Sequence, residues 1–533
     1  GGCTFHDGRP GSGLETEGTL TQWRNATKAD AHSVQAAFSV DATGRPLPGS
    51  PALGAGTTVD GVDEDIDGQP RSGASSIGAW QNAAATTAAA ATAMFAAPAA
   101  HAAGTAAVAA PAAVAVADAS GLPMLACALL AIAPVLLALL AVAWLAYRRN
   151  ITGWLLAYLR QDWRATAPAG ATRHLLFCFV DHYEPGWGKP GIARERARVA
   201  RWRRELPLLC AGHRDADGRP PVHSFFYPGE EYRPEHIDAL VELCRMGLGE
   251  IEIHLHHDDD TEAGLRETLS HFTRLLADRH DALPRDPATG QPRWAFIHGN
   301  WALDNSHPSG RHCGVDNELI VLREEGCYAD FTYPAAPDPC QTRTINRIYR
   351  AKDDPGAPKS HDRGTRVRVG GGGDAEGDLL LIQGPLGLRW DSRKLGILPR
   401  IENADVRAVS PPTARRIDAW VGTGIHVQGR PEWIVVKVHT HGAEDADMDT
   451  LLGDEMDAAF SHLESRYNDG RDWKLHYVSA REAYNIVRAA EDGLAGDPGD
   501  YRDYLISRPC YREREGGDAV HAEAPAGDVV VVR

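Results

Sequence analysis

The 533-residue sequence lacks closely spaced cysteine pairs. Its 9 cysteines are scattered and form no CxxC pair, which argues against a zinc ribbon and against a disulfide framework. Basic residues are also in deficit, since 55 Lys and Arg stand against 72 Asp and Glu and the net charge is −17. A non-specific nucleic-acid binder needs a basic surface, so we expect no nucleic-acid partner. The run Gly370–Gly373 is not followed by Lys-Ser or Lys-Thr, which excludes a P-loop.

Residues 1–120 have few aromatic side chains and no sustained hydrophobic period. They are rich in Gly, Ala, Thr, Ser and Asp, and residues 82–117 are mostly Ala, Thr, Val and Pro. Such a segment cannot bury enough apolar surface to offset the entropy of ordering it. We therefore predict a low-complexity, disordered region. The chain begins with Gly1 rather than Met, and we expect it to be a fragment or a processed product.

Residues 122–147 form a long apolar run without a charged side chain. About 20 such residues span a bilayer. Trp144 and Tyr147 near its end, followed by two arginines, are typical of an aromatic belt with a cationic flank. We predict one transmembrane helix within residues 121–149, which makes the lipid bilayer a partner. A juxtamembrane segment at 150–171 is expected to begin with a short amphipathic helix along the interface.

Short apolar runs alternate with amphipathic segments throughout residues 172–490. The predicted strands are 174–180, 222–227, 250–255, 294–298, 328–332, 378–382 and 433–438, and the predicted helices are 193–209, 234–247, 261–279, 316–325, 447–467 and 480–490. This alternation predicts parallel βα units, and seven or more units favour a barrel over an open sheet. We expect an α/β domain here, followed by a flexible tail at 491–533.

Polar side chains follow four of these predicted strands. The four clusters are Asp181 to Glu184, then His254, His256 and His257 with Asp258 to Asp260, then His298, Asn300 and Trp301, and finally His439 and His441. Each cluster alone has a simpler explanation, such as a surface pair, a helix N-cap or a core histidine. In a parallel α/β fold, however, all carboxyl ends of the strands open on one face. We therefore expect the four clusters to meet at one site.

The residue types in these clusters suit a hydrolytic metal centre. Asp and His bind a divalent cation such as Zn²⁺ and leave one position for water. The metal lowers the pKa of that water and polarises a carbonyl group. A carboxylate then takes the proton of the water, and a histidine protonates the leaving group. We predict a divalent metal cofactor, Zn²⁺ being the first choice.

The body resembles a divergent polysaccharide deacetylase, the NodB homology domain of the carbohydrate esterases. FCFVDHYEP resembles the first motif of that family, in which a hydrophobic strand ends in two acidic residues. The resemblance implies that Asp181 is the catalytic base. The second acid is a metal ligand in the family, and His182 stands in its place and can still bind a metal.

EIEIHLHHDDD resembles the second motif, a pair of metal-binding histidines four residues apart after a strand. His254 fits the first member, and Asp258 stands at the second. A register two residues later pairs His256 with Asp260. His257 is a third candidate, and the sequence leaves these alternatives open.

Two further segments resemble later motifs. VKVHTHG resembles the last motif, which carries the catalytic acid, so that role falls to His439 or His441. FIHGNWALDNS stands where the family has an Arg-x-Pro motif that lines the substrate groove. This segment has no Arg, so His298 or Asn300 is expected to substitute, and Trp301 is expected to line the groove beside them.

The resemblance covers residues 172–490 and implies a distorted (β/α)7 barrel that removes N- or O-acetyl groups from a carbohydrate polymer. One alternative is a glycosidase on a related barrel, which would use paired carboxylates. Another is a non-catalytic sugar-binding or scaffold protein of a polysaccharide assembly system. The positive charges after the predicted span place the body in the cytoplasm, whereas the resemblance implies work outside it. A topology reporter at the C-terminus distinguishes the two locations.

Overall fold

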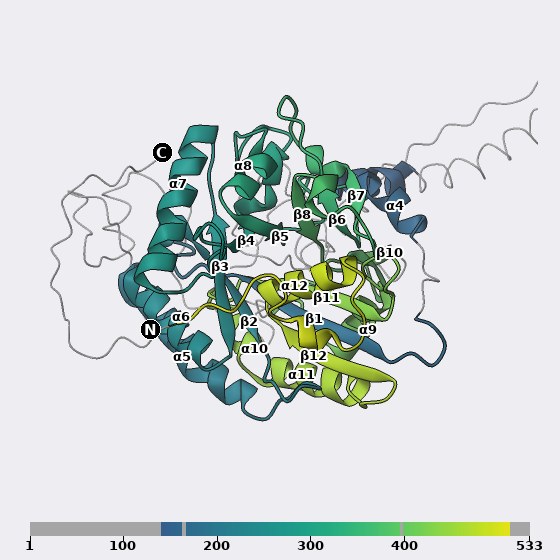
Figure 1. Cartoon of the computed structure of the whole chain (residues 1–533). Helices are drawn as coiled ribbons and strands as arrows, with labels where there is room; N and C mark the ends of the chain where they lie inside the picture. Colours follow the sequence, from purple (N-terminus) through teal and green to yellow (C-terminus); the bar gives the residue numbers. More distant parts are fainter. Residues whose placement is uncertain (1–139, 162–166, 395–397, 512–533) are drawn as a thin grey trace, which may run out of the picture. The chain divides into compact units, whose positions relative to one another are not determined.

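The computed structural model describes residues 140–161, 167–394 and 398–511 (Figure 1). The region predicted to be disordered and residues 122–139 of the predicted membrane span lie outside the described residues. Among the helices of the described ranges, none is both long enough and apolar enough to cross a membrane.

A ten-stranded sheet organises the body. Its strands are β1 (Arg173–His182), β2 (His223–Pro228), β3 (Gly249–Leu255), β4 (Trp294–His298), β5 (Cys327–Asp330), β6 (Ile348–Ala351), β7 (Gly364–Arg366), β8 (Leu379–Ile382), β11 (Trp433–Thr440) and β12 (Trp473–Val478). They follow the order β11-β1-β2-β3-β4-β5-β8-β6-β7, and β12 pairs with β1. All pairs from β11 to β8 are parallel, as is β12 with β1, so the predicted α/β fold is confirmed.

Helices cover the sheet, and a small hairpin stands apart from it. The helices are α4 (Leu155–Leu159), α5 (Ile192–Cys210), α6 (Pro234–Arg245), α7 (Glu262–Arg274), α8 (Glu318–Glu324), α9 (Ala414–Gly422), α10 (Met448–Leu451), α11 (Asp454–Tyr467) and α12 (Ala480–Glu491). The hairpin pairs β9 (Gly387–Lys394) with β10 (Leu398–Glu402). A capping box starts α12, in which Ser479 and Glu482 satisfy each other's backbone N–H groups.

Alternate residues of each strand enter two different cores, because side chains along a strand point to opposite faces. On β1, Phe177 and Phe179 pack in the core that includes α5, α6 and α7, whereas Cys178 and Val180 pack in the core that includes α12. Both faces of the sheet are therefore buried, as is usual for parallel sheets.

Helix α12 is buried along its whole length and lies near the amino ends of the strands. The N–H of Ala480 donates to Ser224 Oγ (2.9 Å), and Arg481 pairs with Glu250 (2.8 Å). Ser224 and Glu250 are the second residues of β2 and β3, respectively. In Figure 1, α12 lies in front of β1 and β11. The carboxyl ends of the strands belong to the opposite end of the body.

A closed (β/α)7 barrel is not confirmed. The sheet path ends at β11 and β7, and in the described residues the only strand-type link between these two edges is an isolated bridge from Arg368 to Gln428. The physical reason is that β6 pairs antiparallel with β8 and thereby takes the edge that closure against β11 would use. The sheet is nevertheless curled, since Lys437 of β11 donates through Nζ to the carbonyl of Phe331 just after β5 (2.7 Å).

The segment expected along a membrane interface packs on the body through one buried side chain. Trp154 is fully buried in a small core with Ala336, Ile345 and Leu386. Leu159, on α4, remains 66% exposed. The aromatic side chain that suggested an interfacial helix therefore anchors residues 151–161 to the domain.

Residues 492–511 belong to the body, so the prediction of a flexible tail is wrong for this part. The Arg502 guanidinium is almost fully buried and pairs with Asp215 (2.8 Å), Asp217 (2.7 Å) and Glu482 (3.0 Å). Tyr511 is also buried. The charges that indicated a solvated tail are instead partners of acidic groups on the domain. Residues 512–533 lie outside the described residues.

Candidate metal centre

Three potential ligands from two strand ends lie around one point. His182 is the last residue of β1, Glu184 follows it by two residues, and His254 lies near the end of β3. Their ligand atoms all lie within 4.8 Å of one another. His254 Nε2 is 3.0 Å from Glu184 Oε1, and all three side chains are buried. Two of the sequence-predicted ligands, His182 and His254, are thus brought together.

The hydrogen bonds around these residues leave a place that suits a cation. His254 Nδ1 lies 2.8 Å from the carbonyl of Ile297, to which only a protonated Nδ1 can donate. In a neutral His254 the lone pair on Nε2 then faces the carboxylate oxygen of Glu184. Within the described residues, the buried atoms His182 Nε2 and Glu184 Oε2 have no hydrogen-bond partner. A divalent ion between these acceptors would satisfy all three, and the bond from His254 to a backbone carbonyl is typical of metal-binding histidines.

His441 is the closer of the two candidate acids. Its ring stacks on His182 with 4.6 Å between ring centroids, whereas the His439 ring is 6.5 Å from that of His182. His439 lies inside β11 and is 3% exposed. The ring centroid of Trp301 lies 6.0 Å from the ring centroids of both His182 and His441, so Trp301 is next to this site.

Burial controls the charges of the cluster. Burial, together with the neighbouring histidines, lowers the pKa of His182 well below its usual value, and burial together with Lys437 does the same for His439. Burial likewise lowers the pKa of His441 to about 4. Burial raises the pKa of Glu184, but His254 and His256 beside its carboxylate outweigh this effect and hold the pKa below its usual range. The site therefore combines the neutral imidazoles of His182 and His441 with one carboxylate, the forms that bind a metal.

His256 lies at the solvent-facing rim of the centre. Its Nε2 is 3.0 Å from Glu184 Oε1, its Nδ1 is 2.6 Å from Glu230 Oε1, and its side chain is 28% exposed. Burial lowers its pKa, but the hydrogen bonds with Glu184 and Glu230 raise it to about 10. Gly299 makes this contact possible, because a Cβ there would stand 2.4 Å from the His256 ring.

Asp181, the expected base, does not join the donor cluster. It is adjacent to His182 in β1, so its side chain points to the other face of the sheet. There its carboxylate accepts hydrogen bonds from His223 Nε2 (2.8 Å) and from the N–H of Gly442 (2.5 Å). A Cβ at Gly442 would come within 2.0 Å of Asp181 Oδ2. Asp181 thus anchors the turn that carries His441.

The other predicted ligands lie elsewhere. Asp258 is held by Arg311 and by the N–H of His312 (2.7 Å), and it is in none of the donor groups of the described residues. His257 and His298 belong to a separate cluster. Asn300 is exposed and has a left-handed backbone (φ 53°). The register that pairs His254 with Asp258 is therefore not supported as a ligand pair.

The sequence placed Glu184 in a strand-end cluster without indicating that it is a ligand, and it did not indicate His223, Cys313 or Glu318 at all. Glu184 was within reach, because a residue two positions after His182 lies on the same face of an extended segment. His223 begins β2 and gives no motif. Cys313 and Glu318 come from a loop and from the start of α8, and no periodicity relates them to the strand ends.

Other acidic and histidine groups exist at the opposite end of the sheet. His174 with His476 and Asp497, and Asp215 with Asp217 and His476, also place ligand atoms within 4.8 Å. Lys474 pairs with Asp497 (2.7 Å), and Arg502 pairs with both remaining aspartates. Positive side chains already neutralise these carboxylates, so they are weaker candidates for a cation.

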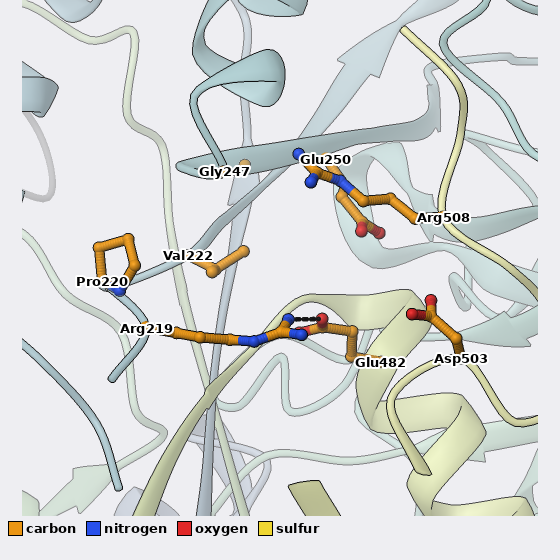
Figure 2. A pocket seen from close by; sticks show the side chains of 9 residues that line it. Arg219, Pro220, Val222, Gly247, Glu250, Glu482, Asp503 and Arg508 are labelled. Carbon is orange, nitrogen blue, oxygen red and sulfur yellow. Dashed lines mark hydrogen bonds and ion pairs between the residues drawn. The ribbon is translucent and has the colours of Figure 1, made fainter. Parts of the chain in front are cut away.

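A surface pocket of about 340 Å³ also lies near the amino ends of β2 and β3 (Figure 2). Arg219 and Glu482, on its wall, form an ion pair of 2.9 Å (Figure 2). Glu250, another lining residue, is held by Arg481. The pocket shares no residue with the histidine cluster, and its acidic groups Glu250 and Glu482 already have partners, so we assign no chemistry to it.

The chain matches no protein-family model and no curated protein sequence. A functional assignment therefore depends on the residues and their geometry.

Proposed function

We propose that this chain is a metal-dependent hydrolase whose centre is formed by His182, Glu184 and His254. One observation carries the proposal: three buried groups from two strand ends direct acceptor atoms at one point, and His182 Nε2 and Glu184 Oε2 have no hydrogen-bond partner among the described residues. Burying acceptor atoms that face one another is costly unless a cation lies between them.

Zn²⁺ is the metal that this ligand set favours. Two histidines and one carboxylate, with a further position left for water, form a ligand set of catalytic zinc sites. Bound Zn²⁺ would polarise a carbonyl group and lower the pKa of the attacking water. The remaining groups of the chain supply orientation and proton transfer.

We assign three supporting roles around the centre. His441 is proposed to accept the proton of the attacking water and then donate it to the leaving group, because it is neutral, stacks on His182 and is the closer of the two candidates. Trp301, beside both, offers an aromatic face on which a sugar ring can pack. Asp181 acts as a positioning residue, because it holds the N–H of Gly442 next to His441.

For the substrate we propose an acetylated carbohydrate polymer, on the resemblance to the polysaccharide deacetylases. The order β11-β1-β2-β3-β4-β5-β8 gives seven parallel strands, which supports a distorted (β/α)7 barrel of that type. The predicted membrane span ends just before the segment that Trp154 anchors to the body. A span at 122–147 would therefore tether the body to the bilayer.

Product analysis on acetylated glycans tests the proposal. The zinc-loaded full-length protein is incubated with N-acetylated and O-acetylated oligosaccharides, and acetate and reducing ends are measured. We expect free acetate, at a rate that falls at least about a thousandfold after metal removal and returns with Zn²⁺. New reducing ends without acetate would establish the glycosidase alternative. Glycan binding without either product would establish a non-catalytic protein. Either result overturns the proposal.

A further inference from the structure

A second group of potential metal ligands shares no residue with the proposed catalytic centre. It consists of His257, His298, Cys313 and Glu318, whose ligand atoms all lie within 4.8 Å of one another. The side chains of His298, Cys313 and Glu318 are fully buried, and that of His257 is 11% exposed. They come from four places: just after β3, the end of β4, the loop 299–317 and the first residue of α8.

The Glu318 carboxylate stands between the other three donors. Its Oε1 is 3.1 Å from His257 Nε2 and 3.5 Å from His298 Nε2, and its Oε2 is 3.4 Å from Cys313 Sγ. In a tetrahedral zinc site with bonds of about 2.0–2.3 Å, neighbouring donor atoms stand about 3.3–3.8 Å apart. The observed separations are close to those of four ligands around one ion.

Unpartnered atoms point into this group. His298 Nε2 is fully buried and has no hydrogen-bond partner in the described part of the chain. The other nitrogen of His298, Nδ1, donates to the carbonyl of Gly299, so Nε2 carries a lone pair in neutral His298. The N–H of Val315 points at Cys313 Sγ (3.5 Å), which suits a thiolate. The backbone N–H of Asp304 orients Glu318 by donating to Oε2 (2.6 Å).

We propose that His257, His298, Cys313 and Glu318 bind a second Zn²⁺ ion at a structural site. Four protein ligands close the coordination sphere, as in structural zinc sites, and a cysteine ligand favours Zn²⁺ over Mg²⁺ or Ca²⁺. The site uses none of the ligands of the proposed hydrolase centre.

The second site lies where a bound ion would fix the loop 299–317. It ties the loop 299–317 to β3, β4 and α8, and this loop carries Trp301. Five non-glycine residues of the loop have positive φ angles: Asn300, Trp301, Asp304, Asn305 and His312. Residues other than glycine rarely adopt this backbone conformation unless other contacts fix it. The second ion would fasten the loop and so hold Trp301 against His182 and His441.

Cobalt substitution of the full-length protein tests the proposal. We expect two bound Co²⁺ per chain and a thiolate-to-cobalt charge-transfer band in the near ultraviolet. Cys313→Ser should remove the band and one equivalent of metal, and His298→Gln should also remove one equivalent. Cys510→Ser, a change at an exposed cysteine, should alter neither. Circular dichroism confirms that each variant is folded.

The outcomes separate this proposal from the hydrolase proposal. His182→Ala should lose one equivalent of metal and keep the thiolate band, because the second site uses none of the first site's ligands. X-ray absorption of the zinc protein should show a sulfur neighbour at about 2.3 Å. A folded wild-type protein without the band, or a band that survives Cys313→Ser, would overturn the second site, whatever the result of the acetate assay.

Discussion

Glu184→Gln should remove one equivalent of metal and lower kcat/KM for acetate release at least about a thousandfold. The reason is that Glu184 is the only carboxylate among the three proposed metal ligands. In the variant, the neutral amide of the glutamine would face His254 and His256. A metal supplies several kcal/mol of transition-state stabilisation, and about 4 kcal/mol corresponds to a thousandfold in rate. Metal analysis and steady-state kinetics measure the two effects on the same preparation.

The matched control is Glu267→Gln, the same change at an exposed position on α7. It should leave metal content and rate unchanged. A Glu184→Gln protein that is folded, retains all its metal and works within a few-fold of the wild type would show that Glu184 is not a ligand. Thermal denaturation of both variants separates loss of metal from loss of fold.

Arg350→Met should destabilise the domain by about 3–5 kcal/mol, the usual cost of removing one partner of a buried ion pair. Arg350 on β6 makes two bonds to Glu491 at the end of α12, of 2.6 and 2.7 Å, and both side chains are almost fully buried. Without the guanidinium, the buried carboxylate loses its bidentate partner. Chemical denaturation, with the free energy of unfolding extrapolated to water, measures the change.

Two further variants make this prediction specific. Arg368→Met breaks an exposed pair with Glu376 (3.5 Å) and should cost less than about 1 kcal/mol. The double variant Arg350→Met with Glu491→Leu should recover most of the lost stability, since it leaves no unpaired charge. An Arg350→Met protein within about 1 kcal/mol of the wild type would show that this buried ion pair between β6 and α12 contributes little to stability.

Hydrophobic patterning predicted the parallel strands β1, β2, β3, β4, β5, β8 and β11 and the end of the sheet at which the histidines gather, but it missed β12, which is parallel to β1. The runs that become β1, β3, β4 and β11 are apolar because both faces of the sheet are buried. The short strands β6 and β7 were not predicted. They contain polar residues and depend on pairing with β8, which is a tertiary contact.

The candidate site was predicted in outline, but not in its ligand set. Side chains alternate along β1, so Asp181 points away from His182, whereas Glu184 lies on the same side as His182. The resemblance to a motif of two adjacent acidic residues drew attention to Asp181 and His182 and away from Glu184. The path of the loop 299–317 brings Cys313 and Glu318 to His257. That path includes left-handed residues whose conformation no local pattern in the sequence indicates.

Anomalous X-ray diffraction at the zinc edge, on crystals of the zinc-loaded protein, shows whether His182, Glu184 and His254 hold a metal ion. We expect a peak about 2.0–2.2 Å from His182 Nε2, His254 Nε2 and a carboxylate oxygen of Glu184. A zinc-replete crystal with no anomalous peak among these three side chains would contradict the proposed metal centre.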